Sequence, residues 1–160
     1  MAKYDLNEAL DNVEIAYNEI IDIANESVAE LTGDLDTLID SVYGNIENLT
    51  NDGIRDILLK LSLRAFSFSG IKDKAAFKAT LAESLRKEAY AKQYSTLGGT
   101  VSSRDSQATL SISNEIIVEH IYNLTASLFK TKLTETHSVI ETLKTVLMSR
   151  LSEAKLVSMG

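Results

Sequence analysis

Basic and aromatic side chains alternate in the middle of the chain, between residues 86 and 104. Arg86, Tyr90 and Tyr94 follow one another at steps of four, so a helix would place them along one face. Cations bind phosphates with release of counterions, and aromatic rings stack on bases at about 1–3 kcal/mol for each base. The segment therefore predicts a surface for single-stranded nucleic acid, formed by Arg86, Lys87, Tyr90, Lys92, Tyr94 and Arg104.

Two consecutive glycines, Gly98 and Gly99, follow this segment in a Ser- and Thr-rich stretch over 95–103. The backbone N–H groups of such a turn can bind phosphate oxygens. A structural role explains the same aromatic residues, because Tyr at helical spacing often packs in a hairpin with its hydroxyl in water. At the level of the sequence, both interpretations stay open.

Residues that could catalyse a reaction do not form a known pattern here. The chain has no Cys, and on one helix its two histidines, His120 and His137, would lie about 25 Å apart. Glu115 and Glu119 share a helix face, but the Glu-x-x-His partner of di-metal bundles is absent. The zinc-protease motif and the glycine-rich phosphate-binding motifs are absent too. We therefore expect no catalytic residues, no metal site and no cofactor.

The composition of the chain favours helices. Its 160 residues include no Pro and only 7 Gly, and apolar residues recur at steps of three and four. The expected fold class is all-α, with elongated helical hairpins or a bundle, a long C-terminal helix and coiled-coil-like packing in an oligomer. The predicted helices cover 4–31, 34–49, 52–67, 73–94 and 104–155.

Residues that typically stop or cap helices define the predicted helix ends. Thr32-Gly33 and Ser69-Gly70 are the expected stops, and Ser103 is the expected N-cap of the last helix. A final helix of about 50 residues would be about 75 Å long. Either it breaks near residues 111–114, or the protein is elongated and buries its apolar seams between subunits. The helix over 73–94 is expected to bury Ala75, Phe77, Leu81, Leu85 and Ala89.

The first predicted helix carries a narrow apolar seam with heptad spacing, which requires a partner helix from this chain or from another subunit. The residues expected to mediate oligomerisation are Leu6, Leu10, Val13, Tyr17 and Ile20.

Charge is distributed unevenly along the chain. Residues 1–56 hold 14 Asp and Glu against Lys3 and Arg55, whereas residues 57–160 hold 14 Lys and Arg against 9 Asp and Glu. This asymmetry suggests an acidic arm, which either solubilises the protein or binds a protein partner, on a body that meets polyanions. The expected organisation is an acidic helical arm over 1–50 and a helical body over 51–160. The body contains the basic helix 73–94, the Gly-Ser loop 95–103 and the long helix 104–155.

The N-terminal residues lack the apolar core of a signal peptide, and no apolar run is long enough to span a bilayer. These features predict no membrane partner. They favour a cytoplasmic protein, in the host cytoplasm if it is viral, or a component of a virus particle.

The order of segments over roughly 75–152 is similar to that of a known family. A basic Ala-rich helix over 85–95 leads into the loop and a charged restart over 98–104, and basic apolar repeats follow over 129–133 and 147–150. This layout resembles the small recombination-mediator proteins of T-even-like bacteriophages. The resemblance implies a ring-like homo-oligomer that binds single-stranded DNA and helps to load a recombinase. It also implies DNA contacts by Arg86, Lys87, Lys92 and Arg104.

Two functional hypotheses follow. The first is a non-enzymatic phage-type accessory protein that oligomerises and binds single-stranded DNA. The alternative is a virion structural or assembly protein, or an inhibitor that binds a host defence enzyme through the acidic N-terminal helices.

Overall fold

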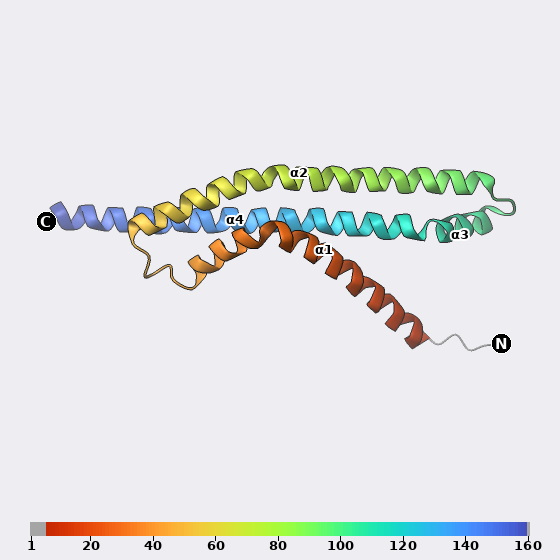
Figure 1. Ribbon diagram of the computed structural model, residues 1–160, viewed down its shortest axis with the longest axis horizontal. Helices are drawn as coiled ribbons and strands as arrows, with labels where there is room; N and C mark the ends of the chain where they lie inside the picture. The colour runs from red at the N-terminus through yellow and green to blue at the C-terminus, as the bar shows by residue number, and fades with distance from the viewer. Residues whose placement is uncertain (1–5, 160) are drawn as a thin grey trace. The chain divides into compact units, whose positions relative to one another are not determined.

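The computed structural model describes the backbone of residues 6–159 and the side chains of residues 14–158. This part of the chain forms four α-helices and no strand: α1 (Leu6–Tyr43), α2 (Asn51–Thr96), α3 (Val101–Ser111) and α4 (Ser113–Met159) (Figure 1). The predicted all-α class is confirmed. Among the described residues, no helix has the length and hydropathy that crossing a membrane requires.

Two of the predicted helix ends are wrong. Helix α1 continues through Thr32-Gly33, and α2 continues through Ser69-Gly70, so the four predicted helices before residue 97 are two. A glycine inside a helix is unfavourable by only about 1 kcal/mol relative to Ala. Burial of the neighbouring Leu35 and Phe68 outweighs this penalty.

Replacing either helical glycine tests the continuity of these helices. No atom lies within 4 Å of a Cβ added at Gly33 or Gly70. Gly33→Ala and Gly70→Ala are each expected to raise the free energy of unfolding by about 0.5–1 kcal/mol, measured by urea denaturation. Gly99→Ala is the contrasting variant, because Gly99 has φ 108° and a side chain there would be strained. Destabilisation by Gly70→Ala would contradict a continuous α2.

The last predicted helix is divided in two, which confirms the alternative with a break near 111–114. Helix α3 ends at Ser111, whose hydroxyl donates to the Ala108 carbonyl at 2.8 Å, and Ile112 leaves helical geometry before α4 begins. Serine side chains compete in this way with the helical backbone bonds. The predicted cap is wrong by three residues: Thr100 is the N-cap of α3, and its hydroxyl accepts from the Ser103 N–H at 3.3 Å.

Contacts between residues divide the chain into two compact units. Unit 1 contains Met1–Val28 and Lys74–Leu128, and unit 2 contains Ala29–Asp73 and Phe129–Gly160. Each unit therefore combines stretches that lie far apart in the sequence.

Unit 2 has a hydrophobic core built from three helices. The buried residues come from α1, α2 and α4 at the helical spacing that the sequence shows: Leu35, Ile39, Val42, Ile54, Leu61, Ala65, Val139, Ile140 and Leu143. Phe68 and Phe129 add an edge-to-face aromatic pair with ring centroids 5.3 Å apart.

Unit 1 is packed mainly through small side chains. Within it, the C-terminal half of α2 runs beside α3 and the start of α4 (Figure 1). The prediction for the buried face of α2 is confirmed at Ala75 and wrong at Phe77, Leu81 and Leu85, which are exposed. Together with Ala75, the buried residues of α2 in this unit are Ala79 and Ala82. Short side chains let neighbouring helix axes approach closely, which explains why the alanines form the contact.

Candidate functional site

The six residues predicted to bind nucleic acid all lie in unit 1, and three of them form one contact group. The rings of Tyr90 and Tyr94 stack with centroids 5.8 Å apart and an interplanar angle of 23°. The Arg104 guanidinium lies 4.1 Å from the centroid of the Tyr94 ring. Its Nη2 also donates to the Tyr94 carbonyl oxygen at 3.0 Å. These contacts join the end of α2 to α3.

Asp105 belongs to this group, although it was not among the residues predicted to bind nucleic acid. The Tyr90 hydroxyl donates to Oδ1 of Asp105, and this hydrogen bond raises the pKa of Tyr90 above its ordinary value. The phenol therefore keeps its proton, and its bond to Asp105, to a higher pH than an isolated tyrosine. The only available signal was the charged pair Arg104-Asp105 directly after the glycine turn.

Arg86 and Lys87 are both engaged by carboxylates. The Arg86 Nε donates to Oε2 of Glu119 on α4, and both side chains are partly buried. Lys87 donates to Glu83 at 2.5 Å, one helical turn away on the exposed surface of α2. The hydrogen bond and the charge of Lys87 lower the pKa of Glu83 below its ordinary value. Arg86 thus connects α2 to α4 within unit 1.

Lys92 is exposed and forms no ion pair with any side chain that the structure describes. With Lys74 and Lys78 it occupies one side of α2, within an arc of about 40° at 100° per residue. The ammonium of Lys78 lies 5.9 Å from the centroid of the Tyr122 ring on α4. This side of α2 therefore carries three cations.

An apolar groove runs beside these lysines between α2 and α4. Its volume is about 510 Å³. The groove is lined by Lys78, Leu81, Ala82 and Leu85 from α2 and by Asn114, Glu115, Val118 and Tyr122 from α4. Sequence analysis missed this groove because it assigned Leu81 and Leu85 to the core.

The predicted oligomerisation residues lie at the N-terminal end of α1. The side chains of Leu6, Leu10 and Val13 are outside the described residues. Tyr17 is exposed and Ile20 is half-buried, and both line a second hollow together with Ala16 and with His120, Asn123 and Leu124 of α4. In unit 1 this part of α1 therefore lies against α4.

Within residues 14–158, no three His, Asp or Glu side chains gather as metal ligands would. His120 belongs to unit 1 and His137 to unit 2, and both are exposed. Of the two carboxylates considered above, Glu119 pairs with Arg86, and Glu115 lines the groove. The site thus offers apolar surface and cations.

Comparison with known proteins found no family model, no curated protein and no solved structure that matches this chain.

Proposed function

We propose that this protein is non-enzymatic and works by self-assembly, in which exposed apolar helix faces are buried against other copies of the chain. The observation that carries the proposal is a row of exposed apolar residues on α2 in unit 2. Leu59, Leu63 and Phe66 follow at steps of four and three, with 61%, 59% and 83% of each residue exposed. Contiguous exposed apolar surface of this kind marks interaction sites on soluble proteins.

The same stretch of α2 has a second apolar side. Ile54, Leu61 and Ala65 are buried in the core of unit 2, while the row faces water. A helix that is apolar on two sides is typical of positions buried within a larger bundle. Fully burying a Leu or Phe side chain contributes about 1.5–3 kcal/mol, so three such residues supply a substantial driving force for association.

The row can be tested by replacing Leu59, Leu63 and Phe66 with Ser in one variant. We expect the wild type to have a mass above that of one chain in size-exclusion chromatography with light scattering. The triple variant should have a lower mass than the wild type while its helical circular dichroism is unchanged, because the replaced side chains lie outside the core. A variant with Met148, Leu156 and Val157 replaced by Ser removes similar exposed apolar area from α4. Loss of assembly in that control alone would refute the row as the interface.

Binding of single-stranded DNA is the second candidate function. This proposal is supported by the cationic side of α2 and by two exposed lysines, Lys92 and Lys87, of which Lys87 pairs with Glu83 on the surface. An assembly would repeat these cations in every copy, and each phosphate contact adds to the salt dependence of binding. Arg86, Arg104 and the two tyrosines would then hold the hairpin in position. A protein that both assembles and binds single strands fits what the resemblance to recombination mediators implies.

The DNA proposal predicts that Lys87→Ala with Lys92→Ala weakens binding of a labelled oligonucleotide about 10-fold and flattens its salt dependence. Fluorescence anisotropy at several salt concentrations measures both quantities. Lys130→Ala with Lys155→Ala removes two exposed lysines of α4 and should leave affinity unchanged. Arg86 is not replaced, because losing its ion pair with Glu119 would also disturb unit 1. Equal affinity and equal salt slope in both variants would refute this ligand.

A further inference from the structure

The groove in unit 1 lacks the third helix that the corresponding helices have in unit 2. In unit 2, α1 covers α2 and α4 with Leu35, Ile39 and Val42. In unit 1, the groove between α2 and α4 stays open, and Leu81, Leu85 and Val118 are 48%, 54% and 44% exposed. Two amphipathic helices normally bury such a groove against a third helix.

The α1 segment of the same chain does not fill this groove. Ala16, Tyr17 and Ile20 of α1 lie against His120, Asn123 and Leu124 of α4. At 100° per residue, these α4 positions point about 180° away from the α4 residues that line the groove. Within unit 1, α1 therefore lies on the opposite side of α4, and the groove is left for another molecule.

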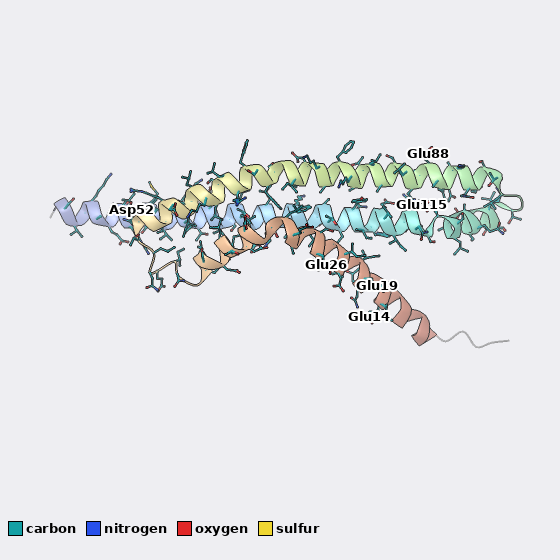
Figure 2. All side chains as sticks on the ribbon, viewed as in Figure 1. Glu14, Glu19, Glu26, Asp52, Glu88 and Glu115 are labelled. Carbon is teal, nitrogen blue, oxygen red and sulfur yellow. The ribbon has the colours of Figure 1, made fainter. Side chains whose placement is uncertain are left out.

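Cations outnumber carboxylates at the groove, which favours an acidic helix. Lys74, Lys78 and Lys92 occupy the groove side of α2, where Glu88 is the acidic residue, and Glu115 of α4 lines the groove. Residues 6–28 of α1 contain six Asp or Glu and no Lys or Arg. Figure 2 shows three of these carboxylates, Glu14, Glu19 and Glu26, along α1. Opposite charges at the edges of an apolar contact determine which helices pair and in which register.

The outer face of α1 also carries apolar side chains. Ile15 and Ile23 are exposed, and they share an arc of about 100° with Glu19, Asp22 and Glu26. The centre of this face lies about 120° around α1 from Ala16, Tyr17 and Ile20, which lie against α4. This face thus combines the two features that the groove requires, which are aliphatic side chains and negative charge.

We propose that the acidic outer face of α1 from a second copy of the chain docks in the α2–α4 groove of unit 1. The proposal rests on the proposed function of self-assembly and specifies one of its interfaces. The two partners contribute different surfaces, so the contact is head-to-tail. Repeated contacts of this type close into a ring or extend as a filament.

Complementation between two variants tests the head-to-tail contact. Leu81→Ser with Leu85→Ser impairs the groove, and Ile15→Ser with Ile23→Ser impairs the outer face of α1. Each variant is made in the chain that already carries Leu59→Ser, Leu63→Ser and Phe66→Ser, and is expected to form at least 10-fold less oligomer in native mass spectrometry than that chain does. In a mixture, the groove variant supplies an intact α1 and the α1 variant supplies an intact groove. The amount of complex that contains one chain of each variant should therefore exceed the amount of complex that either variant forms alone. The control, Phe77→Ser with Ile117→Ser, changes two exposed residues of unit 1 that do not line the groove, and should assemble normally.

Charge reversal provides a second test that does not alter apolar packing. Lys74→Glu with Lys78→Glu should reduce assembly, and Glu19→Lys with Asp22→Lys added to the same chain should restore it. A wild type with the mass of one chain would overturn both this interface and the proposed function. An assembled wild type whose groove and α1 variants still assemble would overturn only this interface. A groove variant that assembles normally but no longer binds an oligonucleotide would assign the groove to nucleic acid, and so would also overturn the proposal.

Discussion

Leu143→Ala is expected to lower the free energy of unfolding by about 3 kcal/mol. Leu143 is fully buried at the centre of the unit 2 core, between residues of α1 and α2. Truncation removes its burial and leaves a cavity, and such substitutions typically destabilise by about 2–5 kcal/mol. Urea denaturation followed by circular dichroism measures the change.

Leu156→Ala provides the matched control for this core substitution. It is the same replacement on the same helix, at a residue that is 72% exposed, so we expect a change within about 0.5 kcal/mol. Similar effects of the two substitutions would contradict the three-helix core of unit 2.

The second large effect is expected at Arg150, which binds the connection between α1 and α2. Its Nη2 donates to the carbonyl oxygens of Ile46 and Glu47, each at 3.1 Å, and its Nη1 donates to the Leu49 carbonyl. Arg150→Ala removes these bonds and leaves the carbonyls without their charged donor. We expect a loss of about 2–3 kcal/mol in the free energy of unfolding.

Arg150→Lys separates the role of geometry from the role of charge. Lysine keeps the charge but lacks the planar guanidinium that reaches several carbonyls. We therefore expect most of the loss in the free energy of unfolding to remain. Arg55→Ala is the control, because Arg55 is exposed and pairs only with Asp52 at 3.0 Å, one turn away. Its effect should be at most about 0.5 kcal/mol, and full rescue by lysine would contradict the carbonyl contacts.

Arg150 also illustrates a limit of sequence analysis. In the sequence, Arg150 is a basic residue at the end of an apolar helix repeat, and nothing near it indicates what it binds. Its hydrogen-bond acceptors lie 101–104 residues earlier in the chain. Only the packing of α4 against the α1–α2 connection in unit 2 brings them together.

The nucleic-acid site could be predicted in part. The stacking of Tyr90 on Tyr94 follows from their spacing of four residues, which places them on one helix face. The partners of Arg86 and Arg104 could not be predicted, because Glu119 and the Tyr94 carbonyl meet them only when the hairpin closes. Contacts within the fold thereby engage both arginines. The exposed lysines are therefore the better candidates for binding phosphate.

The all-α class follows from the amino-acid sequence, as does the helical spacing of the buried residues of unit 2. Helical periodicity is a local property, so apolar residues at steps of three and four identify a buried face wherever one side of a helix is clearly apolar. The absence of Pro likewise allowed long helices, although the expected stops at Gly33 and Gly70 were wrong.

Packing between helices decides which side of α2 is buried in unit 1. Residues 74–96 have two apolar sides, and hydrophobicity alone favours the one with Leu81 and Leu85. The structure buries Ala75, Ala79 and Ala82 instead. Small side chains permit close helix packing. Whether two helices pack closely depends on both surfaces, so it cannot be predicted from the sequence of one helix. For the same reason Leu81 and Leu85 remain at the surface, in the groove that we assign to a second copy of the chain.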